Sequence, residues 1–277
     1  MADVDITPES AGWRYAGLRT AAFTGEYRFV TAADEALVVP LSGSCTVVCG
    51  DRELVLRGRS DVFAGPTDFA YLPRGSTVTL IAANGPCRVA IPTARAESDL
   101  PFRYGAREQV PIEQRGAGSA ARTVRNFCVP ATFDTDRLLA VEVVTPGGNW
   151  SSWPPHKHDE DVEGVDGGET AETAKEEIYY YEGGPGYQRV YSSAAGEIDV
   201  LREVNAGDVV LIPYGYHGPS MAMPGYDLYY LNVLAGADRG ARRSMAFSDD
   251  LRHAWVRETW RTQPESSRDG LSPPGRP

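Results

Sequence analysis

The chain has 277 residues, which is long enough for one large or two ordinary domains. Hydrophobic residues make up 42% of it, which supports a substantial core, while the formal net charge of −11 argues against nucleic acid as a partner because nucleic acid attracts basic surfaces. The amino-terminal residues lack the basic and apolar regions of a signal peptide, and no segment reaches the ~20 apolar residues of a membrane-spanning helix. The sequence therefore predicts a cytoplasmic protein without a membrane partner.

Short apolar segments rich in β-branched residues, separated by glycine and proline, fill the first half of the chain. Many short strands at such spacing are typical of an all-β sandwich or barrel. The predicted strands of this half span 36–40, 45–49, 53–56, 76–81 and 88–91.

All four cysteines, Cys45, Cys49, Cys87 and Cys128, also lie in this half, and they form no C-x-x-C pair. We interpret them as small buried residues in a reducing cytoplasm. Cys45 and Cys49 would point to the same side of one strand, but a metal site there is disfavoured because no histidine lies nearby in the sequence.

The second half continues in the same style but closes with a different kind of segment. Its predicted strands span 138–144, 177–181, 190–191, 208–212 and 227–233. A short helix is predicted around 249–257, with Ser248 as its N-cap. The last stretch, 262–277, is rich in Pro, Ser and Gly, and we expect it to be disordered.

One pattern occurs twice, once in each half: a glycine turn, a strand, then Pro-x-Gly at a tight corner. Aligning Pro73 with Pro213 places Thr77 where His217 stands, and the first copy contains no histidine. Such repetition indicates two copies of one β-unit. We therefore predict an amino-terminal domain over 1–129 without a metal site and a metal-binding domain over 130–261.

Three of the four histidines fall in one pattern of metal ligands. His156 and His158 are two residues apart, so on a strand they project from the same face. Glu177 opens a later apolar run, and His217 follows another. A carboxylate from a second strand and an imidazole from a third can complete a shell around one divalent ion. His253, in contrast, is interpreted as an ordinary surface residue.

These segments form the two halves of a cupin signature, and the resemblance extends further. Gly-Asp, four apolar residues, Pro-x-Gly and His form the second half, while His-x-His followed by Glu forms the first. Matching blocks then run through most of the second half in order, so that the chain resembles the 5-deoxy-glucuronate isomerase family of myo-inositol catabolism. The first half matches only in its general bicupin pattern. The blocks span 148–152, 153–159, 176–180, 187–191, 207–217 and 225–236.

The resemblance implies two cupin (jelly-roll) β-barrels in tandem and an aldose–ketose isomerisation of 5-deoxy-D-glucuronate to 5-dehydro-2-deoxy-D-gluconate. It also implies one divalent metal held by His156, His158, Glu177 and His217. We expect zinc, with manganese, iron(II) and nickel open because the ligand types do not choose among them. The partners it implies are a sugar acid substrate and, because edge strands of bicupins often pair between subunits, further copies of the same chain.

The glutamate ligand is where the chain departs from the usual cupin spacing. Eighteen residues lie between His158 and Glu177, and an acidic run over 159–172 fills most of them. Glu160 is therefore a rival ligand by simple spacing. We prefer Glu177 because it opens a clear strand, on which Glu176 would point to the opposite face. The acidic run itself is interpreted as a solvated loop, since its spacing does not fit an EF-hand.

Isomerisation also requires a base that carries the proton and a cation for the substrate carboxylate. Sequence alone does not rank the candidates. The candidate bases are Glu142, Tyr214, Tyr226 and Tyr229. The candidate cations are Arg189, Lys157 and Arg125, of which Lys157 is expected to face away from the metal.

Three other functions remain open at this stage. The same ligands support another metal cupin enzyme, either a uronate isomerase or an Fe(II) dioxygenase. A non-catalytic sugar-binding bicupin is a further alternative, although the intact ligand set counts against it. A DNA-binding regulator is disfavoured because we find neither a helix-turn-helix segment nor a basic patch.

Overall fold

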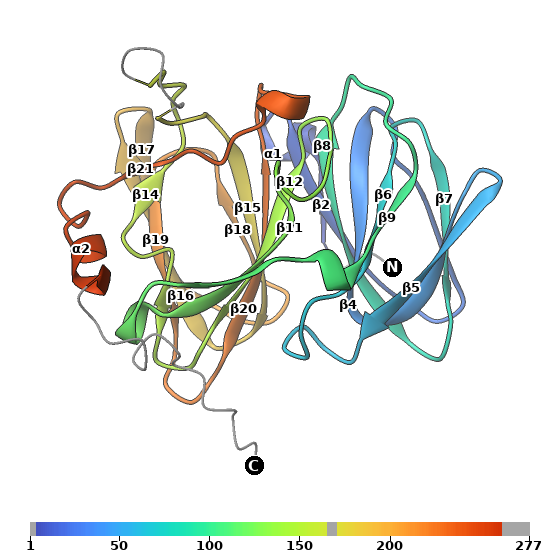
Figure 1. Cartoon of the computed structure of the whole chain (residues 1–277), viewed down its shortest axis with the longest axis horizontal. Coiled ribbons are helices and arrows are strands. Elements are labelled where there is room, and N and C mark those ends of the chain that lie inside the picture. Colours follow the sequence, from blue (N-terminus) through green and yellow to red (C-terminus); the bar gives the residue numbers. More distant parts are fainter. Residues whose placement is uncertain (1–3, 165–170, 262–277) are drawn as a thin grey trace.

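The structure is a computed structural model that describes residues 4–164 and 171–261. Two β-units lie side by side, with the chain passing once from the first to the second (Figure 1). The prediction of an all-β fold with tandem barrels and a short carboxy-terminal helix is confirmed. No helix in these ranges is long and apolar enough to cross a membrane.

The first unit is one nine-stranded sheet that folds around its own core. Its central strand β4 is buried on both sides: Leu37 and Val39 face one hydrophobic cluster, while Val38 and Val47 face another. Its elements are β1 (Asp5–Ile6), α1 (Pro8–Ala11), β2 (Ala16–Phe23), β3 (Glu26–Val30), β4 (Asp34–Cys49), β5 (Arg52–Arg59), β6 (Phe69–Leu72), β7 (Thr77–Ala82), β8 (Cys87–Arg95) and β9 (Arg103–Gly105).

The second unit packs two sheets face to face. One has the order β10 (Ile112–Arg115), β11 (Arg122–Cys128), β12 (Leu139–Thr145), β20 (Leu228–Ala235), β15 (Glu176–Gly183) and β18 (Val209–Ile212). The other has the order β17 (Gly196–Val204), β16 (Gly186–Ser193), β19 (Tyr216–Ala222), β14 (His156–Lys157) and β21 (Ser248–Asp249), with β13 (Trp150–Ser151) also on β19. Short 3-10 helices at Arg107–Gln109, Gly118–Ala120 and Gly240–Arg242 join the strands.

Strand pairing divides the two units earlier than the sequence predicts. β10 and β11 precede residue 130, yet they hydrogen-bond through β12 into the sheet of the second unit. A domain that began at residue 130 would lose β10 and β11, the two strands at one edge of this sheet. We therefore propose that the division falls between β9 and β10.

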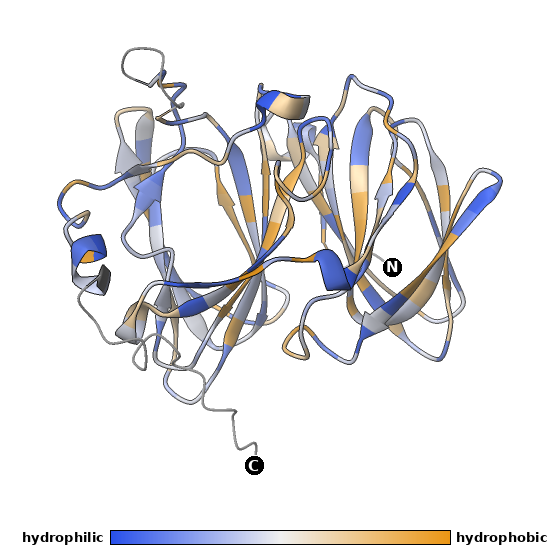
Figure 2. Ribbon diagram, in the orientation of Figure 1, coloured by the Kyte–Doolittle hydropathy of each residue, from blue (hydrophilic) through white to orange (hydrophobic). Residues whose placement is uncertain are grey.

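A shared apolar layer joins the units. Successive residues of β15 alternate between this layer, which holds Ile178 and Tyr180, and the interior of the second unit, which holds Tyr179 and Tyr181. Figure 2 shows hydrophobic residues along the strands that face each other between the units. Because the middle of β15 is buried on both faces, Ile178–Tyr181 is a continuous apolar and aromatic run instead of an alternating one.

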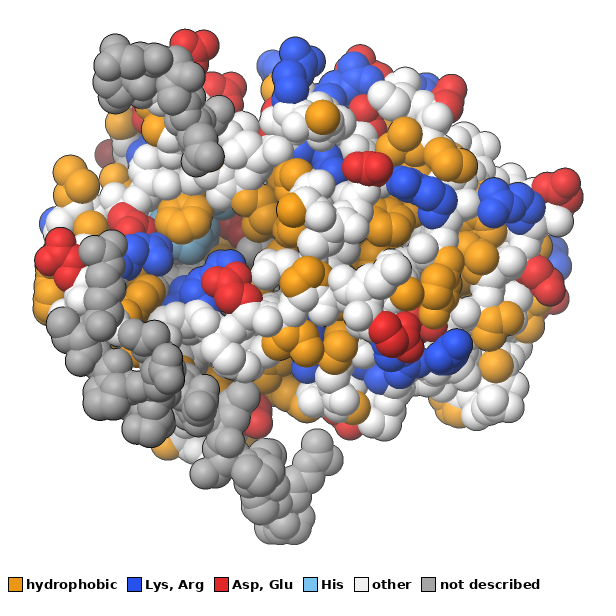
Figure 3. All heavy atoms as spheres, in the orientation of Figure 1, with side chains coloured by type: hydrophobic (Ala, Val, Ile, Leu, Met, Phe, Trp, Pro, Cys, Tyr) orange, Lys and Arg blue, Asp and Glu red, His pale blue; other side chains and the backbone are white. Residues whose placement is uncertain are grey.

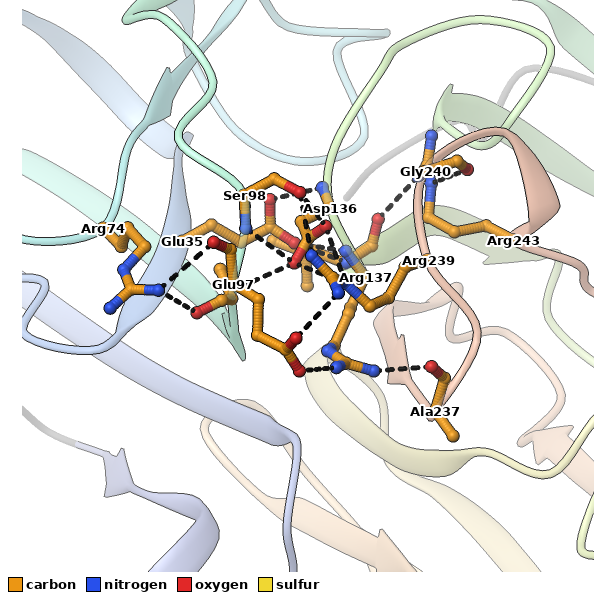
Figure 4. A network of polar contacts seen from close by, with 12 residues as sticks. Glu35, Arg74, Glu97, Ser98, Asp136, Arg137, Ala237, Arg239, Gly240 and Arg243 are labelled. Carbon is orange, nitrogen blue, oxygen red and sulfur yellow. Dashed lines mark hydrogen bonds and ion pairs between the residues drawn. The ribbon is translucent and has the colours of Figure 1, made fainter.

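Polar contacts fix the docking of the units at the edge of that layer. The Glu176 carboxylate accepts hydrogen bonds from the backbone N–H groups of residues 14–16 at 2.7–2.8 Å. In the network of Figure 4, buried Glu35 accepts the N–H groups of residues 136–138, and Arg137 bridges Glu97 of the first unit to the Ala237 carbonyl. As predicted, Glu176 faces away from the interior that Glu177 enters.

The repeated segments fold alike. β6 and β18 each follow a glycine with positive φ, Gly65 or Gly207, and each leads to a second, Gly75 or Gly215. In the first unit Thr77 then opens β7, whereas in the second His217 lies in β19. The predicted duplication is visible in the backbone.

The carboxy-terminal helix begins later than predicted. Ser248 and Asp249 form β21, which pairs with β14, and α2 covers only Val256–Arg261. Asp250 instead accepts the backbone N–H of Arg252 and so closes the turns that precede the helix. Strand pairing therefore outcompetes the helical pattern. The predicted tail, 262–277, and part of the acidic run, 165–170, lie outside the described residues.

The cysteines are free thiols in the structure. Cys45, Cys87 and Cys128 are buried and Cys49 is half-buried. Cys45 and Cys49 belong to or pack against the same hydrophobic cluster, as expected of two residues on one side of β4.

Candidate metal centre

Strand pairing brings the histidines together, and the facing of the two sheets of the second unit brings Glu177 to them. His156 on β14 is the register partner of His217 on β19. Glu177 enters from β15 in the opposite sheet. Gly218 allows the β19 backbone to approach closely, since a Cβ at this position would lie 1.8 Å from the Ser152 carbonyl oxygen.

Glu177 is the centre of the cluster. Its Oε2 atom lies 2.9 Å from His158 Nε2 and 2.9 Å from His217 Nε2. The ring of His156 packs beside them, with its centroid 4.4 Å from that of His217. One ligand atom from each of His158, Glu177 and His217 lies within 4.8 Å of the others. The glutamate and His217 are almost fully buried, at 1% and 0% exposure.

Backbone carbonyls orient two of the imidazoles. His156 Nδ1 lies 3.3 Å from the Pro154 carbonyl oxygen, and His217 Nδ1 lies 3.3 Å from that of Gly215. A carbonyl only accepts, so Nδ1 carries the hydrogen in both rings and Nε2 keeps its lone pair. Metal-binding histidines are held in this way.

Two buried ring nitrogens lack the hydrogen bonds that a protein interior normally provides. His158 Nδ1 has no partner among the described residues, and His217 Nε2 contacts Glu177 without hydrogen-bond alignment. Buried polar atoms are rarely left unsatisfied. A divalent cation beside Glu177 would satisfy His217 Nε2, so the residues present fit a metal ion.

The charge states also suit a metal. Burial raises the pKa of the Glu177 carboxyl, but the adjacent His217 and His158 imidazoles lower it further, so this pKa falls well below its usual range. Burial, followed by the neighbouring His217, holds the pKa of His156 well below its ordinary value. At neutral pH the cluster therefore offers a carboxylate and a neutral imidazole, the forms that bind metals.

The rival ligand Glu160 lies in a different cluster. Lys157, on the other face of β14, places its Nζ 2.7 Å from Asp159, 2.9 Å from Glu160 and 2.9 Å from Glu172. This part of the acidic run is thus ordered around a lysine that already supplies the positive charge. The geometry favours Glu177.

The histidine cluster opens into a cavity of about 600 Å³ between the two sheets. Its walls mix apolar side chains such as Val141 and Phe247 with the polar groups of Tyr179, Tyr230 and Asn232. In Figure 3 a histidine is visible at the bottom of a hollow on the surface. A small polar ligand can therefore reach the cluster from solvent.

The family is decided by comparison with known proteins. The model of the KduI/IolB family matches residues 1–256. The chain belongs to the KduI/IolB family. The curated relatives of this family member include 5-deoxy-glucuronate isomerases of Geobacillus kaustophilus (38% identity, 92% of this chain and 91% of the relative) and Bacillus velezensis (34%, 92% and 92%).

Solved structures agree with this membership. An IolB-like protein from Salmonella typhimurium superposes with a TM-score of 0.82 at 33% identity, over 92% of this chain and 94% of that one. Oxalate decarboxylase from Lactobacillus farciminis has a TM-score of 0.59 at 13% identity, over 96% and 87%, which indicates a shared fold only.

Two of the predicted catalytic residues lie on the face of their sheet that points away from the cavity of the histidine cluster. Glu142 on β12 and Tyr229 on β20 face the first unit, where Glu142 contacts Arg59, Arg125 and Tyr229. Val141 and Val143, one residue to either side of Glu142, line the cavity instead. The expectation that Glu142 or Tyr229 moves the proton, and that Arg125 binds the substrate, is therefore corrected.

The other candidates also lie outside the cavity. Arg189 donates to backbone carbonyls of β16 and β17 and pairs with exposed Asp199. The Tyr214 hydroxyl donates to the Glu197 carbonyl oxygen at 3.1 Å, and Tyr226 is half exposed. The expectation that Arg189 and Tyr214 are catalytic is therefore corrected, because neither residue lies in the cavity.

Sequence reasoning missed the polar groups that do line the cavity. Ser152 places its hydroxyl 3.0 Å from the Tyr179 hydroxyl and 3.1 Å from that of Tyr230. One signal was present: Tyr179 follows Glu177 by two residues and so shares its face. Nothing in the sequence marks Arg122 on β11, which also lines the cavity.

Proposed function

We propose that this protein converts 5-deoxy-D-glucuronate to 5-dehydro-2-deoxy-D-gluconate in inositol catabolism, and that the reaction depends on one divalent metal ion. The observation that carries the proposal is the cluster of histidines around Glu177 at the bottom of an open cavity, in a family whose curated relatives are 5-deoxy-glucuronate isomerases. We also propose a cytoplasmic enzyme that assembles with further copies of itself.

His156, His158, Glu177 and His217 would hold the metal. A bound divalent ion supplies a Lewis acid that polarises a carbonyl and orients the neighbouring hydroxyl oxygen. Zinc is the ion we favour, and manganese, iron and nickel suit the same donors.

The tyrosines of the cavity would donate hydrogen bonds to substrate oxygens. Burial, followed by the nearby Glu177 charge, raises the pKa of Tyr179 well above its ordinary value. Burial also raises the pKa of Tyr230. Both hydroxyls therefore hold their protons at neutral pH. Ser152, between them, keeps the two hydroxyls in place.

Arg122 is the cation that we assign to the substrate carboxylate. Three other cations of the cavity are paired with acidic side chains: Arg115 with Glu113, Lys175 with Asp238 and Arg257 with Asp249. Arg122 is 6% exposed and, within the described ranges, no carboxylate lies within ion-pair distance of it. Its guanidinium donates to the Ala120 carbonyl and packs on the Trp260 ring. A buried cation of this kind favours an anionic ligand.

Replacing Arg122 by glutamine should raise KM for the sugar acid by on the order of tenfold or more, because a charge-assisted hydrogen bond of about 1.5–3 kcal/mol is lost. Steady-state kinetics measures this KM in the variant and in the wild type. The Arg115→Gln variant is the control, since that arginine already pairs with Glu113. An equal change in both variants would remove Arg122 from this role.

Anaerobic NMR of the metal-loaded enzyme with 5-deoxy-D-glucuronate tests the function itself. We expect the aldehyde signal to be replaced by that of the 2-ketose although oxygen is absent. Conversion of 5-keto-4-deoxyuronate alone would reassign the enzyme as a uronate isomerase, and a requirement for oxygen would reassign it as a dioxygenase. No turnover of any of these substrates would contradict the proposal.

A further inference from the structure

Asn232 presents an unsatisfied amide oxygen to the cavity. Its Oδ1 atom is buried and has no hydrogen-bond partner among the described residues, and the residue is 9% exposed. A buried amide normally finds a partner, and an unpaired one costs about 1–3 kcal/mol. The residue lines the cavity of the histidine cluster. The missing partner is therefore expected to come from a ligand.

The sheet register places Asn232 close to the metal ligands. It lies on β20 directly opposite Tyr179 on β15, and Glu177 is two residues before Tyr179 on the same face. Neighbouring strands are ~4.8 Å apart, and residues two apart on one strand are ~6.7 Å apart. Asn232 and Glu177 are therefore diagonal neighbours on the inner face of one sheet, separated by a distance that a short sugar chain can bridge.

The neighbours of Asn232 on the adjacent strands do not supply a hydrogen-bond donor to its amide oxygen. Val141, its register partner on β12, is apolar. The Tyr179 hydroxyl is engaged with Ser152 instead. An amide oxygen accepts hydrogen bonds, so the group that completes it must be a donor. On a sugar acid the donors are the hydroxyl groups of the carbon chain.

We propose that Asn232 is a substrate-binding residue whose amide oxygen accepts a hydrogen bond from a hydroxyl of the sugar chain beyond the two reacting carbons. This inference rests on the proposed function and deepens it, because it assigns the hydroxyl pattern of the substrate to a particular side chain. A site that hydrogen-bonds a substrate hydroxyl discriminates strongly against analogues that lack it.

The test compares Asn232→Leu with the wild-type enzyme on 5-deoxy-D-glucuronate and on its analogues lacking the hydroxyl at C3 or at C4. Leucine has nearly the shape of asparagine without its polar atoms. We expect kcat/KM for the full substrate to fall by on the order of 10–100-fold, because a buried hydrogen bond to the substrate is lost. For the analogue that lacks the bonded hydroxyl, the two enzymes should differ by less than about threefold.

Stability separates a binding role from a structural one. Removing an unsatisfied buried polar group should leave the melting temperature of Asn232→Leu unchanged or raise it. Asn126→Leu is the matched control: it lines the same cavity, but its Nδ2 already donates to Glu113 at 3.2 Å, so the same hydroxyl selectivity should not appear.

Two results would overturn the inference while the wild type is active: no loss in Asn232→Leu, or an equal loss on all three substrates. A wild type that converts none of them would instead overturn the proposed function, and with it this role of Asn232.

Discussion

Replacing Glu177 by glutamine is expected to reduce isomerase activity by on the order of 10³-fold and to abolish stoichiometric metal binding. The variant keeps the shape of the side chain but removes the negative charge that lies 2.9 Å from two imidazole nitrogens. A Lewis-acid metal contributes several kcal/mol to such a reaction, and each 1.36 kcal/mol corresponds to about tenfold in rate. Activity and metal content are measured on the same purified sample.

The chain offers two controls for Glu177. Glu176 is its neighbour on the opposite face and binds backbone N–H groups of the first unit, so Glu176→Gln should keep its metal. Glu160, the rival by spacing, pairs with Lys157, and Glu160→Gln should keep its metal as well. Metal loss in Glu160→Gln with retention in Glu177→Gln would reverse the ligand assignment.

Glu142→Gln should lower the free energy of unfolding by about 3–5 kcal/mol, because it leaves two buried arginines without their counter-charge. Glu142 and Arg59 are each 2% exposed as side chains, and Arg125 is 6% exposed. A loss of this size lowers the melting temperature of a protein this large by roughly 10 °C. Thermal or urea unfolding measures it, and once folded the variant should retain most of its activity since Glu142 faces away from the cavity.

An exposed ion pair and an acid titration control this prediction. Asp199→Asn removes the partner of Arg189, but Asp199 is 85% exposed, so a change in the free energy of unfolding below about 1 kcal/mol is expected.

An acid titration tests the ion pair of Glu142 itself. Burial raises the pKa of Glu142, and the charge of Arg59 lowers it further, to a net value below the ordinary one. A lowered folded-state pKa gives stability that is present above about pH 4.3 and lost as pH falls. The difference between wild type and Glu142→Gln should therefore shrink in acid, and a constant difference would contradict the ion-pair account.

The clustering of the proposed metal ligands and the positions of most strands could be predicted because local patterns determine them. Two histidines two residues apart must share one face of a strand, and the step from Glu176 to Glu177 must change faces. In the structure His158 approaches Glu177 beside the ring of His156, and Glu176 binds the first unit instead. The glycine corners at Gly75 and Gly215 likewise need only the local chain.

Where a strand is buried on both sides, the sequence did not predict which of its side chains point into the cavity. β12 has apolar residues on both faces, so the sequence of 139–145 does not say which face lines the cavity. Glu142 resembled a catalytic base for that reason, yet its partner Arg59 lies 83 residues earlier. Such a contact follows only from how the two units dock. The short pairing of β21 with β14, which displaced the predicted helix, is non-local in the same way.

The most direct measurement of the central claim is the initial rate of isomerisation as metal is added back to the metal-free enzyme. The account predicts no turnover without metal and a linear rise that ends at one equivalent of metal per chain. Full turnover by the metal-free enzyme would contradict it, as would a rate that does not respond to the first equivalent.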